Sequence, residues 1–227
     1  MKFTEELRAK FMEVDPAQIG HYVGGGFMDP AIKPVWRATP RVEKAKMVGP
    51  AYTVRLSGDD SAMIYYAIEH APRGSVLVVD RCGDKTYACV GDICAECAKN
   101  AGLAGIVVDG VSTDSVGIAK IDFPVFSRGI SPITTKLRGN EGEVNIPVNC
   151  GGAVVKPNDI VFGDPDGVMV FDQDADFMTL VERAKADNDK EVEWRKRIRA
   201  GEPMTQLLNG SLQKALEPLL EKRHLVW

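Results

Sequence analysis

The middle of the chain alternates short apolar segments with a helical segment, and this order constrains the fold more than any other feature. Residues 75–80 and 104–109 are near-continuous apolar runs, as in strands buried on both faces of a sheet. Residues 92–101 between them have a helical pattern and are followed by Gly102, a residue type that commonly ends helices. This spacing predicts parallel strands joined by a helical crossover, and hence an α/β fold.

Further elements extend this unit in both directions. Residues 51–56 and 123–126 are expected to be strands, and residues 60–70 a helix that Asp59 or Asp60 caps. All of these strands should join one sheet with their helices packed against its faces, because each crossover returns the chain to the same sheet.

The two ends of the chain have residue patterns that differ from those of the middle. Residues 1–20 carry apolar side chains at near-helical spacing, which predicts an N-terminal helix. After Gly142, short strand-like runs alternate with Gly, Pro, Asn and Asp, which is typical of β-hairpins or a meander. Residues 174–200 and the tail after them are expected to be helical and highly charged. We therefore expect an α/β domain over residues 1–172 and, over residues 173–227, a helical extension that packs on this domain or on a neighbouring subunit.

The composition excludes several classes of partner. A net charge of -4 argues against binding to a nucleic-acid backbone, which requires a basic surface. No apolar run reaches the roughly 18 residues that a membrane span needs, and the acidic start of the chain is unlike a signal peptide. The five cysteines, an odd number, are typical of reduced thiols. We expect a cytoplasmic protein with no membrane and no nucleic-acid partner.

The predicted helix after the first buried strand begins at a natural anion site. Ligands of such sheets bind at the edge where parallel strands end and the next helices begin. The backbone amides of Gly91, Asp92, Ile93 and Cys94 open the helix, and its positive dipole end favours a carboxylate or phosphate. These four residues are therefore candidates for substrate binding.

The charged residues at this edge each have an alternative role. Asp92 and Asp114 could hold Mg²⁺ or Mn²⁺ through oxygen ligands, or both could be ordinary helix N-caps. Arg81 and Arg128 could face a ligand or lie on the surface. Cys94 and Cys97 are spaced as in redox and zinc motifs, but without a second pair or a nearby histidine they indicate core packing.

Several segments together resemble the RraA-like superfamily, which includes 4-hydroxy-4-methyl-2-oxoglutarate / 4-carboxy-4-hydroxy-2-oxoadipate aldolases and the regulator of ribonuclease activity A. Some of its members are also called demethylmenaquinone methyltransferases. The resemblance covers roughly residues 20–172. The segments that carry it are residues 49–54, 74–80, 91–92, 104–110, 123–129 and 163–168.

The resemblance implies a swivelling-type α/β sandwich with parallel crossover units, a C-terminal β-meander and a helical extension. It also implies a homotrimer or a dimer of trimers (a homohexamer), with active sites between subunits. The long charged helix is similar to that of the aldolase branch, where a neighbouring subunit can contribute a carboxylate. The candidates for that carboxylate are Asp189, Glu191 and Glu193.

The aldolase motif is an aspartate, twenty residues, and then Arg-Asp. Here Asp92 and Asp114 are in register, but Thr113 stands at the arginine position. By resemblance, the helix-opening amides bind the pyruvoyl carboxylate, Asp114 holds Mg²⁺ or Mn²⁺, and Asp92 positions or deprotonates a water or a substrate hydroxyl. Thr113 would meet the keto oxygen, and Arg81 is a candidate to replace the missing guanidinium.

These features predict a lyase that cleaves carbon–carbon bonds in a small anionic oxo-acid with the help of a divalent metal. Retro-aldol cleavage of 4-hydroxy-4-methyl-2-oxoglutarate and decarboxylation of oxaloacetate, both yielding pyruvate, need the same stabilised enolate. Two alternatives remain. Thr113 could mark a different enzyme on this scaffold, such as a hydratase or isomerase, and the chain could be a non-catalytic regulator.

Overall fold

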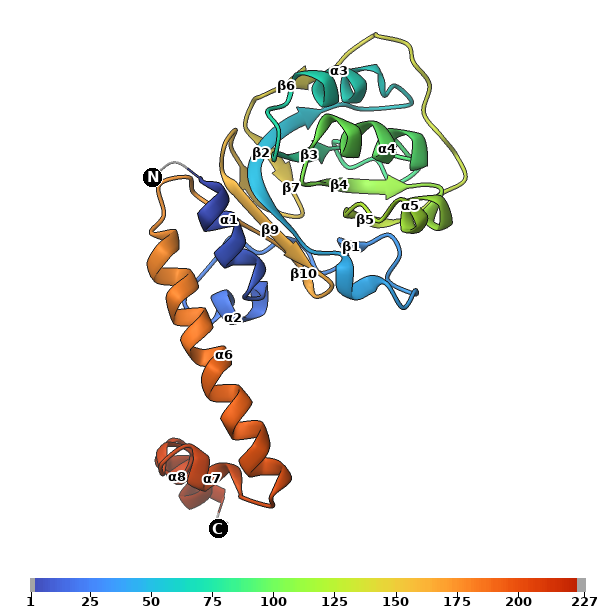
Figure 1. Cartoon of the computed structure of the whole chain (residues 1–227). Helices are drawn as coiled ribbons and strands as arrows, with labels where there is room; N and C mark the ends of the chain where they lie inside the picture. Colours follow the sequence, from blue (N-terminus) through green and yellow to red (C-terminus); the bar gives the residue numbers. More distant parts are fainter. Residues whose placement is uncertain (1–2, 224–227) are drawn as a thin grey trace.

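A computed structural model describes residues 3–223 of the chain (Figure 1). The helical elements are α1 (Glu5–Met12), α2 (Pro16–Gly20), a 3-10 turn (Val42–Lys44), α3 (Ala62–His70), α4 (Asp92–Ala101), α5 (Ser115–Ile121), α6 (Phe177–Arg199), α7 (Met204–Leu207) and α8 (Ser211–Arg223). The strands are β1 (Lys33–Pro34), β2 (Met47–Arg55), β3 (Val76–Asp80), β4 (Gly105–Ser112), β5 (Val125–Ile130), β6 (Glu143–Val144), β7 (Val148–Cys150), β8 (Ala153–Val155), β9 (Ile160–Asp164) and β10 (Gly167–Phe171).

One mixed sheet organises the molecule, in the order β1-β5-β4-β3-β2-β9-β10, with β6 paired to β2. The four central strands β2 to β5 are parallel, as the alternation of segments predicts. The outer strands β1, β6 and β9 pair antiparallel with their neighbours. The α/β architecture expected from the sequence is confirmed.

The side chains of the parallel strands are apolar and buried, as in a sheet that is covered on both faces. Residues 76–79 of β3 are fully buried, as are residues 106–108 of β4. Helices α3, α4 and α5 pack beside these strands (Figure 1). The expected helix boundaries at Asp92 and Gly102 are correct, and Gly102 has the left-handed conformation (φ 81°) that ends α4.

A second apolar cluster lies around the β9–β10 hairpin. The N-terminal segment is two helices rather than the single expected one, because Asp15 and Pro16 end the first helix and start the second. Phe11 of α1 is fully buried, and its ring centroid lies 5.2 Å from that of Phe162 and 6.0 Å from that of Phe177. The first turns of α6 therefore pack against the body through this cluster.

After β6, which pairs with β2, the remaining strands pair as two hairpins and not as one continuous meander. β7 and β8 form a separate two-stranded sheet, whereas β9 and β10 extend the main sheet beyond β2. The turn between β9 and β10 lies within the segment 163–167, at residues 165–166, and the Asp164 side chain accepts a hydrogen bond from the Asp166 amide (2.8 Å). This segment acts as a turn, as its flanking strands predict.

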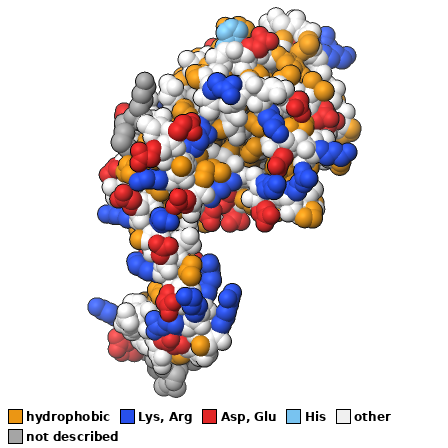
Figure 2. Space-filling model, in the orientation of Figure 1, with side chains coloured by type: hydrophobic (Ala, Val, Ile, Leu, Met, Phe, Trp, Pro, Cys, Tyr) orange, Lys and Arg blue, Asp and Glu red, His pale blue; other side chains and the backbone are white. Residues whose placement is uncertain are grey.

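The C-terminal extension projects away from the body (Figure 1). Within α6 the buried residues are Phe177, Val181 and Ala184, so the helix leaves the body after its second turn. Acidic and basic side chains are mixed over the visible face of the projecting part (Figure 2). The tail is helical to Arg223, and the expectation for residues 224–227 lies outside the described part. Among residues 3–223, no helix has the length and hydropathy of a membrane span.

Candidate functional site

The predicted edge of the sheet contains a cavity of about 200 Å³ at the start of α4. It brings together six of the residues singled out from the sequence, which are Gly91, Asp92, Ile93, Cys94, Thr113 and Asp114. The remaining lining residues are Ser61, Tyr65, Ala88, Cys89, Thr134, Thr135, Lys136 and Leu137. A cavity of this size is suited to a small metabolite and too small for a dinucleotide.

The amides at the start of α4 are engaged by the protein's own carboxylates. Gly91 is the N-cap, so Asp92 occupies the first helical position and the N-cap alternative for Asp92 is wrong. The Asp92 amide points to Asp114 Oδ2 (3.4 Å), and the Ile93 amide donates to Asp92 Oδ1 (2.8 Å). The N-terminus of α4 is thus already faced by the carboxylates of Asp92 and Asp114, as the helix dipole favours. An incoming anion would have to share the backbone amides with these carboxylates or displace them.

Asp114 has a left-handed backbone (φ 52°) at the N-cap of α5, and its side chain makes no capping hydrogen bond. Aspartate tolerates this conformation better than most residues. The turn directs the Asp114 carboxylate back toward the start of α4, where its Oδ2 faces the Asp92 amide. The other oxygen, Oδ1, lies 3.4 Å from the hydroxyl of the preceding residue, Thr113. A site role for this carboxylate therefore fits the geometry better than ordinary capping.

Two glycines allow the carboxylates to come close to the backbone. A Cβ at Gly91 would lie 3.0 Å from Thr113 Cγ2 and even closer to the Asp114 carboxylate. A Cβ at Gly117 of α5 would lie 2.8 Å from Asp92 Cβ and 3.0 Å from Asp92 Cγ. Neither position can gain a side chain unless a carboxylate moves. Gly117 was not found from the sequence, since nothing in its local pattern indicates a contact with a residue 25 positions away.

Lys136 also lines the cavity and was not predicted from the sequence. It lies in the segment 131–137, here called the strap, which follows β5 and contributes residues 134–137 to the cavity lining. The strap is fixed by backbone hydrogen bonds on both sides. The Lys136 amide donates to Asp59 O (2.7 Å), and the Ala88 amide donates to Ile133 O (2.7 Å). Only the long-range pairing brings Lys136 to α4, so no local spacing could have predicted it.

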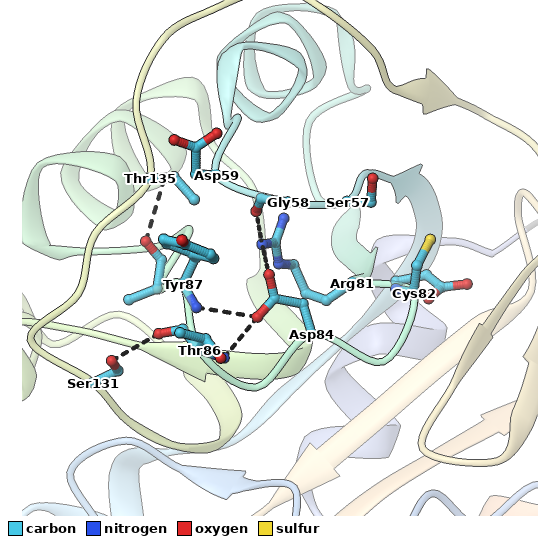
Figure 3. Close-up of polar contacts among 12 residues, drawn as sticks. Ser57, Gly58, Asp59, Arg81, Cys82, Asp84, Thr86, Tyr87, Ser131 and Thr135 are labelled. Carbon is cyan, nitrogen blue, oxygen red and sulfur yellow. Dashed lines mark hydrogen bonds and ion pairs between the residues drawn. The ribbon is translucent and has the colours of Figure 1, made fainter.

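Arg81 is not among the residues that line the cavity, and Figure 3 shows its guanidinium beside Gly58 and Asp84. Its side chain is fully buried, donates to Gly58 O (2.5 Å) and forms an ion pair with Asp84 (3.1 Å). Its Nε and Nη1 have no hydrogen-bond partner among the described residues. The structure therefore does not bring Arg81 together with Thr113. Arg128 is also bound elsewhere, in ion pairs with Asp109 and Asp29.

The thiols at the cavity are protonated at neutral pH. Burial raises the pKa of Cys89 to about 11 and raises the pKa of Cys94 further still. Cys94 packs in the core as expected, whereas Cys97 is exposed. A thiol with a raised pKa is a poor nucleophile and a poor metal ligand, so the chemistry of the cavity falls to its carboxylates, hydroxyls and lysine.

A second, larger cavity of about 600 Å³ lies elsewhere, beside β8, β10 and the loop at Gly25 and Gly26. Its charged lining residues are Lys156, Asp159 and Asp172, and the Lys156–Asp172 pair is already satisfied at 3.1 Å. The segment 24–26 is a loop, as predicted, and none of the residues expected to act chemically faces this cavity.

Comparison with known proteins gives a consistent assignment. The sequence pattern of the RraA-like family, described as Aldolase/RraA, matches residues 19–170. A protein of Halalkalibacterium halodurans, named provisionally as a 4-hydroxy-4-methyl-2-oxoglutarate aldolase, is 35% identical over 79% of this chain and 83% of its own.

Two solved structures share the fold. An uncharacterized protein of Pseudomonas syringae pv. tomato is 25% identical with a TM-score of 0.74, over 91% of this chain and 94% of its own. RraAS2 of Streptomyces coelicolor, described as an unusual member of the RNase ES inhibitor RraA family, is 25% identical with a TM-score of 0.67, over 87% and 98%. With the sheet order, the cavity and the family match in agreement, the chain belongs to the RraA-like family.

Proposed function

We propose that this protein is a lyase that cleaves a carbon–carbon bond in a small 2-oxo or hydroxy diacid and releases pyruvate. The observation that carries the proposal is the convergence of Asp92, Thr113 and Asp114 at one small cavity that also has a lysine. The name of the Halalkalibacterium halodurans relative supports aldol cleavage as the reaction class.

The donor set of the cavity fits a magnesium or manganese ion better than zinc. Among residues 3–223 there is no cluster of three His, Cys, Asp or Glu side chains of the kind that encloses zinc. Mg²⁺ commonly binds through one or two carboxylates and fills its other positions with water and substrate oxygens. Asp114 would hold the ion, with Asp92 nearby, and the bound ion would supply Lewis-acid stabilisation of an enolate.

The chain's own residues have distinct proposed roles. Lys136 attracts the anionic substrate and stands in for the charge that the aldolase motif places at position 113. The Thr113 hydroxyl donates one neutral hydrogen bond to the oxygen of the developing enolate, a weaker contact than a guanidinium would give. Asp92 takes the proton of the substrate hydroxyl, directly or through a water, as the carbon–carbon bond breaks. The proton that Asp92 has taken is then returned, directly or through the same water, to the enolate carbon to give pyruvate, while the hydroxyl-bearing carbon leaves as a carbonyl group.

The direct test is an assay of pyruvate release from 4-hydroxy-4-methyl-2-oxoglutarate and from oxaloacetate. Each substrate is incubated with Mg²⁺ or Mn²⁺ and again with excess chelator, and Asp114→Asn serves as the inactive control. We expect turnover that requires both the metal and Asp114. If neither substrate gives metal-dependent pyruvate, the lyase proposal is wrong.

A non-catalytic regulatory role is the second candidate, favoured by the absence of the motif arginine and by the similarity to RraAS2. Under this alternative the same cavity has no turnover. Inhibition of an RNase E-type endonuclease by the intact protein, unchanged in Asp92→Asn and Asp114→Asn, would support the regulator and count against the enzyme.

A further inference from the structure

The buried Arg81 has a consequence for the cavity that it does not line. Its guanidinium has no solvent-exposed surface and forms a single ion pair, with Asp84, while two of its nitrogens have no partner in the described structure. Burying a guanidinium is costly unless its contacts compensate. Leucine or methionine would fill a similar volume without the cost of burying a charge. The hydrogen bonds and the ion pair of Arg81 therefore indicate which part of the structure its charge stabilises.

Arg81 joins two loops that are separate in the sequence (Figure 3). One nitrogen, Nη2, donates both to Gly58 O, in the loop between β2 and α3, and to Asp84 Oδ2, in the loop between β3 and α4. The other oxygen of Asp84 accepts from the amides of Thr86 (2.6 Å) and Tyr87 (3.1 Å). The charge of Arg81 therefore sets the shape of the second loop and its position relative to the first.

The same two loops carry the strap. On one side the Ser131 hydroxyl donates to Thr86 O (2.8 Å), and the Thr135 amide donates to Ala88 O (3.1 Å). On the other side the Ser61 amide donates to Lys136 O (2.9 Å), next to the bond between the Lys136 amide and Asp59 O. The strap thus bridges the two loops that Arg81 connects, and Lys136 lies at its second attachment.

We infer that Arg81 is a positioning residue: it fixes the spacing of the loops on which the strap rests and so holds Lys136 at the cavity. Its effect on ligands is indirect and passes through Lys136. The part of this inference that concerns anion binding rests on the proposed function, whereas the part that concerns the strap does not.

The first experiment measures the strap without any ligand. Amide hydrogen exchange is compared in the wild-type protein, Arg81→Met and Arg128→Met, the last being a control because Arg128 is likewise an ion-paired guanidinium, although it is partly rather than fully buried. Arg81→Met should speed exchange at Ala88, Thr135 and Lys136 by about tenfold or more, beyond any global change, and Arg128→Met should not. Equal exchange in the two variants overturns the inference. If Arg81→Met does not fold, Arg81→Lys and Asp84→Asn replace it with the same expected pattern.

The second experiment tests the route through Lys136 with oxalate, a stable anion shaped like the pyruvate enolate, in the presence of Mg²⁺. Oxalate affinity is measured in the wild-type protein, Arg81→Met, Lys136→Met and the double variant. We expect Arg81→Met to weaken binding by about tenfold when Lys136 is present and to have no further effect when it is absent. Additive losses overturn the inference. Coupled losses in a protein that releases no pyruvate would refute the proposed lyase activity while leaving the role of Arg81 intact.

Discussion

At residue 113 a hydroxyl stands where the aldolase motif has a guanidinium, and its neighbour Asp114 lies 3.4 Å away. A guanidinium at this position would add a charge-assisted donor for the enolate oxygen. Thr113→Arg should therefore raise kcat for pyruvate release, by up to the 100- to 1,000-fold that one oxyanion donor typically contributes. The measurement is steady-state kinetics with Mg²⁺. Thr113→Gln is the control for side-chain length, and an equal gain in that variant would show that charge is not the cause.

Gly117 gives a second prediction at this scale. A Cβ there would press against Asp92 Cβ as well as its carboxylate, so Gly117→Ala should displace Asp92, reduce kcat by at least about tenfold and lower stability. The matched control is Gly24→Ala, where no heavy atom lies within 4 Å of the added Cβ. Kinetics and a thermal melt of both variants provide the test. Full activity in Gly117→Ala would mean that the position of Asp92 is not critical.

At the scale of elements, α1 packs on the body through Leu7 and Phe11, and Arg8 donates hydrogen bonds to Val48 O and Gly74 O. Phe11 is fully buried among the rings of the second cluster, whereas its neighbour Met12 is 44% exposed. Phe11→Ala should lower the free energy of unfolding by about 3–5 kcal/mol, as expected for a large buried aromatic side chain. Met12→Ala should change it by less than about 0.5 kcal/mol. Urea denaturation measures both values, and similar effects would show that α1 contributes little to the fold.

The junction between α3 and the strap depends on pH through Asp60. The Ala62 amide and the amides of Asn140 and Arg138 hold the pKa of the buried Asp60 carboxyl below its usual range. Because the folded pKa lies below the unfolded value of about 3.9, this stabilisation is present above that pH. It is lost as the pH falls through the folded pKa. Asp60→Asn should reduce stability at pH 7 and show a smaller further loss between pH 5 and pH 2 than the wild type. An equal pH dependence in both proteins would contradict this role.

How far the sequence could predict these elements depended on the range of the interactions involved. The strands around residues 76–79 and 106–108 and the helix that ends at Gly102 are encoded by local patterns, and all were predicted. The pairing of β9 with β2 and the attachment of the strap to Asp59 and Ala88 depend on contacts between distant segments. For the same reason Asp92 and Asp114 could be placed at one edge from topology, whereas Lys136 and Gly117 could not.

At the scale of the whole molecule, the described part of the extension beyond Ala184 contacts the body through exposed polar side chains, in the Lys185–Glu13 ion pair and the Tyr22–Asp187 hydrogen bond. A chain that ends at residue 186 should therefore keep the free energy of unfolding of the α/β body within about 0.5 kcal/mol. The resemblance to the aldolases predicts that the full chain is a trimer or hexamer, and the truncated chain should show whether residues 187–227 are needed for that state. Sedimentation and urea denaturation measure the two properties separately. A large loss of stability in the truncated chain would show that the extension folds back on its own body.

The length of α6 also makes the far end of the molecule sensitive to small changes at its base. The 15 residues from 185 to 199 span about 22 Å of helix at roughly 1.5 Å per residue. If α6 tilts as a rigid rod about Ala184, a change of only about 10° in its direction moves its tip by about 4 Å. This displacement is greater than the length of a hydrogen bond. Substitutions at the pivot, such as Val181→Ala, can therefore change the reach of the extension without altering any residue at its tip.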